Sequence, residues 1–253
     1  MNPITTLRRT AVVAVAAACL PALAACSTGS STADDAADPT ATTTADADAF
    51  PVTVESALGD AVIESEPERV VTVGYADADV ALSLGVVPIA SERITWGGTE
   101  DGSSVWFDEA LAEIDGAEPP LRLDTTDGIP VDEIIALEPD LVLGTNSGLT
   151  QKDFDKLTAA GIPTVAYPGD MWFTDWKESL EIAGEALGRS DVAADVTVET
   201  EELIADTAAD YPQLEGATIA YTYLNAADTS QIGIYSAEEN RPRLLAELGV
   251  GAP

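Results

Sequence analysis

The chain of 253 residues contains no histidine and only two cysteines. Without histidine it cannot build a Ser-His-Asp or Cys-His catalytic group, or the histidine-rich sites that usually bind zinc or manganese. The G-x-S-x-G, G-x-G-x-x-G and P-loop motifs are absent from the sequence as well. Scattered carboxylates can in principle perform acid–base chemistry, which leaves an enzyme as a rival interpretation, but carboxylates alone seldom select a transition metal. We therefore expect no catalytic residues, no metal held by protein ligands and no cofactor.

Basic residues are scarce. The sequence has 11 Lys and Arg against 45 Asp and Glu, a net charge of −34. Removal of residues 1–25, argued below, would delete two arginines and leave nine basic residues, a net charge of −36. Such a protein is not expected to bind nucleic acid through phosphate contacts. The acidic residues are scattered rather than blocked, which indicates a solvated surface.

The N-terminal segment is typical of a secretory signal. Two arginines precede an apolar run at residues 11–24, which is shorter than the roughly 20 residues that span a bilayer. The run ends in Leu23-Ala24-Ala25-Cys26, which resembles the bacterial lipobox. We expect residues 1–25 to be a lipoprotein signal peptide, Cys26 to carry the lipid, and residues 26–50 to form a disordered tether. The alternative is an ordinary signal peptide in which Cys26 is incidental. Because Cys19 would be removed, no disulfide or thiolate site would remain.

Residues 51–175 show the pattern of an α/β lobe. Alternating apolar and polar residues at 52–55 and 61–64 flank a Gly-Asp turn and predict a β-hairpin. Buried strands are then predicted at 69–74, 86–90, 140–144 and 162–167, and helices at 76–84, 106–114, 130–137 and 151–160. This alternation predicts a parallel sheet with helices on both faces, in which ligands gather at the carboxyl ends of the strands.

The rest of the chain predicts a long helical connection and a second lobe. Helices are expected at 176–187 and 190–209, the second one capped by Ser190 or Asp191, within an interlobe segment 176–211. Strands at 217–221 and 231–235 and a helix at 241–248 would then begin a C-terminal α/β lobe, residues 212–253. Two or three strands make a poor independent core, so we expect this lobe to be incomplete.

Several segments in order resemble the siderophore- and cobalamin-type substrate-binding proteins of ABC importers, from about Glu66 to the last residue. They are Pro67-Glu68-Arg69-Val70-Val71, Asp79-Val80-Ala81-Leu82-Ser83-Leu84-Gly85-Val86, Asp132-Glu133-Ile134-Ile135-Ala136-Leu137-Glu138-Pro139-Asp140-Leu141-Val142, Asn146-Ser147-Gly148-Leu149 with residues 157–163, and residues 241–249. The resemblance implies two α/β lobes joined by a long rigid helix, with a ligand in the shallow cleft between them. It implies a protein lipid-anchored to the outer face of the cell membrane that captures a ferric siderophore and delivers it to the permease of an ABC importer.

The resemblance leaves two alternatives open and carries one departure. A cobalamin or haem carrier of the same fold is the nearest alternative, and a metal-ion-binding relative is a weaker one. Members of this family usually continue for several dozen residues beyond the point that matches Pro253, so we expect the second lobe to be truncated here. The resemblance also places a permease-docking glutamate at Glu133, beside Asp132, which we expect to be an ordinary solvent-facing acid.

Candidate ligand-binding residues are aromatic and polar side chains that follow predicted strands. An iron chelate already supplies oxygens to its metal, so its site needs aromatic walls, hydrogen-bond donors and, for an anionic chelate, arginine. The candidates are Tyr75, Arg93, Trp96, Trp106, Asn146, Ser147, Trp172, Tyr223, Tyr235 and Arg241. Arg93, close to Trp96 in a loop-rich stretch, is the best candidate to hold a carboxylate or catecholate. We expect ordinary packing for Tyr167, Trp176 and Tyr221, solvated positions for Arg69, Lys152, Lys156, Lys177, Arg189 and Arg243, and a place near a strand end for Arg122.

Overall fold

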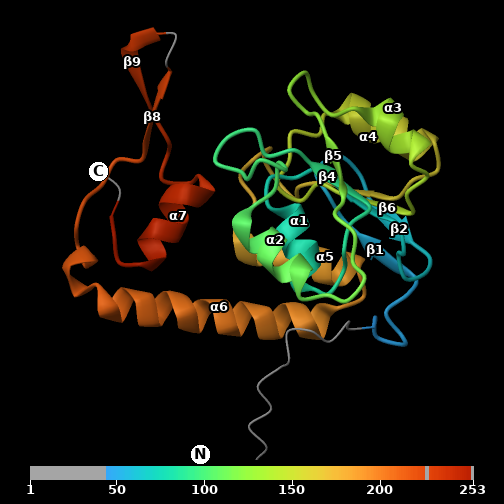
Figure 1. Ribbon diagram of the computed structural model, residues 1–253, viewed down its shortest axis with the longest axis horizontal. Coiled ribbons are helices and arrows are strands. Elements are labelled where there is room, and N and C mark those ends of the chain that lie inside the picture. The colour runs from blue at the N-terminus through green and yellow to red at the C-terminus, as the bar shows by residue number, and fades with distance from the viewer. Residues whose placement is uncertain (1–43, 226–227, 252–253) are drawn as a thin grey trace, which may run out of the picture. The chain divides into compact units, whose positions relative to one another are not determined.

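The three-dimensional structure is a computed structural model that describes residues 44–225 and 228–251 (Figure 1). The predicted signal peptide, Cys26 and most of the predicted tether lie outside these residues. Within the described part of the chain, no helix is both long enough and apolar enough to cross a membrane. The lobe boundaries given above stay predictions.

The first strands form the predicted hairpin. Strand β1 (Val52–Val54) pairs antiparallel with β2 (Ala61–Ile63), with Val52 opposite Ile63. The two strands follow the period of two expected for a half-buried ribbon: Ala61 and Ile63 are buried while Val62 points to solvent. The buried face packs against helix α5 (Trp176–Ala186).

The centre of the molecule is an all-parallel sheet with the strand order β5-β4-β3-β6-β7, which confirms the predicted α/β fold. Its strands are β3 (Val70–Thr72), β4 (Ala90–Glu92), β5 (Leu121–Leu123), β6 (Leu141–Leu143) and β7 (Thr164–Val165). The predicted strand at residues 86–90 was placed too early in the chain. Pro88 has no N–H to donate to a neighbouring strand, and the pairing begins at Ala90. Strand β5 was not predicted: it is a short edge strand in which Leu121 is exposed, so it lacks the apolar run of a central strand.

Helices cover both faces of this sheet, as predicted. Helices α1 (Asp77–Ser83), α2 (Val105–Ala112) and α5 lie on one face, and α3 (Val131–Ala136) and α4 (Gln151–Ala159) lie on the other (Figure 1). Each face has its own core, the first built around Val70, Leu141 and Leu187 and the second around Val71, Val142 and Leu157. Alternate residues of β3 and β6 therefore serve opposite cores, which is the pattern that buries a parallel strand on both sides.

The long helix α6 (Ser190–Asp210) has 21 residues, about 30 Å at 1.5 Å per residue. The prediction that Ser190 or Asp191 caps it was wrong: Ser190 is the first helical residue, and Arg189 occupies the N-cap position without a capping side-chain bond. Arg189 is also not solvated as expected. Its side chain is buried, donates to the carbonyl of Leu187, and pairs with Glu66 at 2.9 Å.

After a short 3-10 turn, η1 (Pro212–Leu214), the chain forms a hairpin and a helix. Strand β8 (Thr222–Asn225) pairs antiparallel with β9 (Asp228–Ile234), and α7 (Asn240–Glu247) follows. The strand predicted at residues 217–221 was wrong, because in this stretch Thr218 makes an isolated bridge to Gly251 and the ladder begins at Thr222. Leu224, Ile232 and Ile234 are exposed on the hairpin.

Candidate ligand-binding site

The loops after strands β3, β6 and β7 meet at one edge of the sheet. Strands β3 and β6 are direct neighbours, so the residues that follow them pair as well: the Tyr75 N–H donates to the carbonyl of Asn146 at 3.1 Å, and Gly74 bridges Ser147. Strand β7 lies beside β6 and delivers the loop that carries Trp172 to the same edge. This is the carboxyl edge of a parallel sheet, where α/β folds place their ligands.

A fully buried carboxylate supports this edge from below. Asp77 accepts hydrogen bonds from the backbone N–H of Thr145 at 2.9 Å and from its hydroxyl at 2.6 Å. Burial raises the pKa of Asp77, and the hydrogen bonds from Thr145 oppose that shift. The hydroxyl of Thr174 in turn donates to the carbonyl of Thr145 at 2.5 Å, so the β6 and β7 loops are tied together. The edge is therefore held by buried hydrogen bonds rather than by surface contacts.

Above this edge lies a cleft of about 830 Å³, large enough for a drug-sized ligand. Its lining divides into a first wall from the sheet edge, α1 and the start of α5, and a second wall from α7 and the residues before it. The first wall includes Tyr75, Val80, Asn146, Trp172, Asp175 and Trp176, and the second includes Glu239, Asn240, Arg241, Arg243, Leu244 and Glu247.

Direct hydrogen bonds join the two walls. The side-chain amide of Asn240 donates to the carbonyl of Thr174 at 2.5 Å, and Arg243 donates to the carbonyl of Phe173 at 3.1 Å. The indole N–H of Trp176 donates to Glu247 at 3.3 Å. Since these bonds involve the residues just before and at the start of α5, they fix α7 beside that helix start.

The indole of Trp172 is the most unusual feature of the first wall. Its backbone has a φ of 69°, a left-handed conformation that costs a bulky L-residue of order 1–3 kcal/mol. A Cβ built on Gly148 would lie 2.7 Å from the Cζ2 atom of this indole, so the ring rests directly on the Gly148 backbone. Backbone strain of this kind occurs most often at binding and active sites.

Charged groups on the second wall occur in pairs. Arg241 pairs with Glu239 at 2.9 Å and its guanidinium lies 4.2 Å from the centre of the Tyr235 ring. Arg243 lies 3.7 Å from the carboxylate of Asp175 on the first wall. Glu247 lies 3.7 Å from the Lys177 ammonium. The side-chain oxygens of Asn146 and Asn240 are buried acceptors that receive no hydrogen bond from the residues that the structure describes.

Four of the sequence-predicted candidates line this cleft together: Tyr75, Asn146, Trp172 and Arg241. Ser147 does not, because its side chain is fully buried and its hydroxyl donates to the carbonyl of Gly144 at 2.7 Å. We therefore place Ser147 in the support of the loop and not in the wall.

Three other candidates lie outside the cleft, in the stretch from β4 to the first turn of α2. Trp96 and Trp106 are 88% and 74% exposed. Arg93 is exposed, rests against Gly102, and makes no ion pair within 4.0 Å among the residues that the structure describes. The structure thus does not bring Arg93 to the aromatic wall where we expected it.

A partly buried polar cluster lies beside Tyr75. Asp79 accepts from Ser104 at 2.5 Å, and Arg122 donates to Ser91 and lies 4.0 Å from Asp108. Burial raises the pKa of Asp79 and lowers the pKa of Arg122. Arg122 is the middle residue of the three-residue strand β5, one position from its end, as expected.

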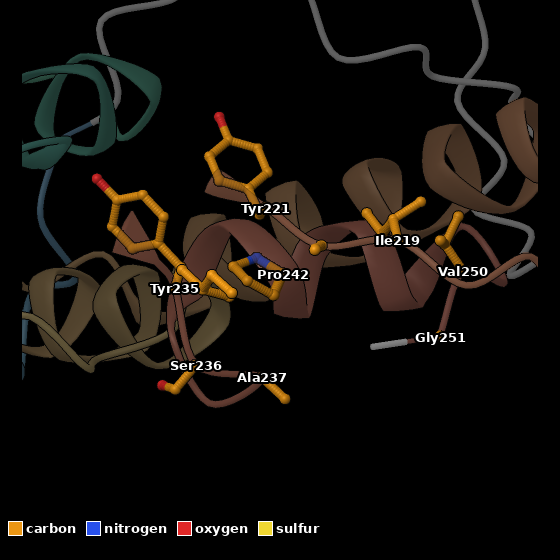
Figure 2. A pocket seen from close by; sticks show the side chains of 10 residues that line it. Ile219, Tyr221, Tyr235, Ser236, Ala237, Pro242, Val250 and Gly251 are labelled. Atoms are coloured by element: carbon orange, nitrogen blue, oxygen red, sulfur yellow. The ribbon is translucent and has the colours of Figure 1, made fainter. Parts of the chain in front are cut away.

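Tyr235 lines a second, smaller cavity of about 190 Å³ in the C-terminal segment, and the Tyr223 ring lies beside that of Tyr235. Figure 2 shows Tyr221 and Tyr235 at one end of this cavity and Ile219 and Val250 at the other. The Tyr235 ring lies 5.5 Å from that of Tyr221 and 5.3 Å from that of Tyr223. Tyr235 reaches the large cleft indirectly, through the guanidinium of Arg241 that lies over its ring.

Most of the cleft lining was not among the sequence-predicted candidates, including Asp175, Trp176, Glu239, Asn240, Arg243 and Glu247. Trp176 packs against the first core as expected, and it also lines the cleft and bonds across it. Arg243 is partly exposed, as expected, but it too lines the cleft and bonds across it. No local signal distinguished them, because a helix period shows which residues share a face and not what that face meets. Tyr167 does pack as expected: it is buried, and its hydroxyl donates to the carbonyl of Leu149 at 2.9 Å. Among the described residues, no three Asp, Glu or Cys side chains gather closely enough to hold a metal ion.

Comparison with known proteins places this geometry in a family. PiaA of Streptococcus pneumoniae TIGR4 in complex with ferrichrome is 31% identical over 80% of this chain and 67% of its own, with a TM-score of 0.73. Another structure of PiaA, described as an iron uptake ABC transporter substrate-binding protein, is 30% identical over 80% and 68%, with a TM-score of 0.71. A periplasmic solute binding protein from Mycobacterium smegmatis is 31% identical over 80% and 68%, with a TM-score of 0.68. None of the curated proteins compared matches the chain. The family model described as periplasmic binding protein matches residues 70–250, and the chain belongs to that family.

Proposed function

We propose that this protein captures a ferric siderophore outside the cytoplasm and delivers it to the permease of an ABC importer. The observation that carries the proposal is the cleft of about 830 Å³, with Tyr75 and Trp172 on one wall and an arginine-bearing helix on the other. Aromatic faces and a few convergent polar groups suit a large chelate whose iron already has its oxygen ligands. The likeness to PiaA, an iron uptake substrate-binding protein seen with ferrichrome, supports the same ligand class.

A titration of the chain with ferric siderophores, cobalamin and haem tests this function. Trp172 and Trp176 line the cleft, so ligand entry should change tryptophan fluorescence, and calorimetry should confirm the binding. We expect saturable binding of at least one ferric siderophore and none of cobalamin or haem. Binding of cobalamin or haem in preference to every chelate would contradict the proposal.

We also propose that Cys26 anchors the protein to the outer face of the cell membrane. The support is the sequence Leu23-Ala24-Ala25-Cys26 after a short apolar run and before a polar segment. We predict that Cys26→Ser releases the protein into the medium or leaves it unprocessed. A wild-type mature chain that starts at another residue, without lipid and in a membrane-free fraction, would rule the anchor out.

Docking on the permease is proposed for Glu133, which is exposed in the first turn of α3 and does not line the cleft. We predict that Glu133→Ala lowers siderophore uptake by cells severalfold and leaves the affinity of the purified protein unchanged. Asp132→Ala, a neighbouring exposed acid paired with Lys156 at 2.7 Å, is the matched control and should keep uptake. Equal uptake by both variants would remove Glu133 from the docking surface.

A further inference from the structure

The charged residues of the cleft carry information about the class of chelate. Its lining contains two arginines and three carboxylates: Arg241, Arg243, Asp175, Glu239 and Glu247. Each arginine already has a carboxylate, Glu239 at 2.9 Å and Asp175 at 3.7 Å. Among the described lining residues, therefore, no cation is left without a carboxylate beside it.

An anionic ligand could not take these arginines without cost. Glu239 is buried and accepts from the backbone N–H of Arg241 at the start of α7, so its carboxylate cannot move away when a ligand arrives. Asp175 is partly exposed, but it accepts from the N–H of Glu178 as the cap of α5, which orients its carboxylate. An anion at either guanidinium would lie beside a fixed like charge, which is unfavourable at these distances.

The remaining polar groups of the walls are neutral. The amides of Asn146 and Asn240 are neutral and their side-chain oxygens are buried, so they offer no positive charge to an anion. Tyr75 and Trp172 offer a hydroxyl, an indole N–H and apolar ring faces. Beyond the cleft, the net charge of −34 repels anions at low salt. At physiological ionic strength, salt screens this repulsion over a distance of about 8 Å.

We infer that the cleft selects ferric chelates without net charge, the tris-hydroxamate class, over multiply anionic chelates of the tris-catecholate class. Three hydroxamates neutralise ferric iron, whereas three catecholates leave three negative charges. This inference rests on the proposed function and specifies its ligand. The discrimination comes from the fixed carboxylates Glu239 and Asp175, which cancel the arginines that an anionic chelate would otherwise use.

The test compares ferrichrome, a neutral tris-hydroxamate, with a ferric tris-catecholate by calorimetry at low and high ionic strength. We expect ferrichrome to bind at least about tenfold more tightly, with an affinity that salt does not change. The catecholate affinity should rise with salt, because salt screens repulsion between exposed charges. No binding of either chelate would overturn the inference, and no binding of any ferric siderophore would overturn the proposed function as well. A catecholate that binds as tightly as ferrichrome, and more weakly as salt rises, would overturn the inference alone.

A charge-removing variant tests the cause. Glu239→Gln frees the Arg241 guanidinium from its carboxylate and keeps an oxygen that can accept from the α7 N–H. It should raise the ratio of the catecholate affinity to the ferrichrome affinity about threefold to tenfold. Asp132→Asn removes one carboxylate from an ion pair that lies outside the cleft, and should leave the ratio of the two affinities unchanged. An equal shift in both variants would show that total charge, and not the cleft, sets the preference, which would overturn the assignment to Glu239.

Discussion

Replacing Gly148 by alanine tests whether the contact beneath the Trp172 indole shapes the cleft. The new Cβ would lie 2.7 Å from Cζ2, 3.4 Å from Cε2 and 3.6 Å from Nε1 of that ring. Carbon atoms in contact prefer about 3.5–4.0 Å, so the nearest ring atom must withdraw by roughly 0.8 Å or more. The backbone of Gly148 does not have a positive φ, so the methyl group itself causes no backbone strain.

The direction in which the Trp172 ring moves decides how much stability is lost. Overpacking a closed core costs about 1–3 kcal/mol, but Trp172 is 41% exposed and can shift toward solvent. We therefore expect a stability loss of about 1 kcal/mol or less, partly offset by the 0.4–1 kcal/mol that Gly→Ala gains from the unfolded chain. The ligand should lose its aromatic contact, and we expect about a tenfold weaker siderophore affinity, equivalent to about 1.4 kcal/mol.

The measurement is calorimetric affinity together with urea unfolding of the same samples. Gly169→Ala is the matched control, because it lies in the loop that carries Trp172 and a Cβ there would meet nothing within 4 Å. It should bind as the wild type does and be equally or slightly more stable. Unchanged affinity in Gly148→Ala with unchanged Trp172 fluorescence would refute the argument that this glycine positions the cleft wall.

Two further predictions concern stability. Burial raises the pKa of Asp77, Asp79 and Glu92 above the ordinary 3.8 for aspartate and 4.5 for glutamate. The folded protein therefore binds protons at these groups more tightly than the unfolded chain does, and the free energy of unfolding should increase as pH falls from 7 through the folded pKa values. Urea unfolding at constant ionic strength checks this, and a decrease in the free energy of unfolding between pH 7 and 5.5 would contradict it. Glu66→Ala removes the carboxylate that lies 2.9 Å from the buried Arg189. It should lower the free energy of unfolding by about 1–3 kcal/mol, which is less than for a fully buried pair because Glu66 is partly exposed. A decrease of less than about 0.5 kcal/mol in urea unfolding would show that the protein does not need this pair for stability.

Local patterns predicted most of the elements because their causes are local. The hairpin of β1 and β2, the helices α1 to α7, and the central strands β3, β6 and β7 follow from the hydrophobic periodicity of the sequence. The failures occurred where the local signal is weak. The edge strand β5 lacks a buried run, and Pro88 moved the start of β4 beyond the apolar stretch.

The cleft itself was decided by contacts between distant parts of the chain. Tyr75 and Asn146 are 71 positions apart and meet because β3 pairs with β6. Arg243 and Trp176 line the cleft because α7 lies beside the sheet edge and the start of α5. Trp96 and Trp106, in contrast, face solvent. The sequence by itself determined the fold class, the family resemblance and the acidic character, since these depend on residue order and composition. The tertiary structure alone decided the members of the cleft and the pairing of its arginines, because strand order and side-chain neighbours are non-local and no period along the chain encodes them.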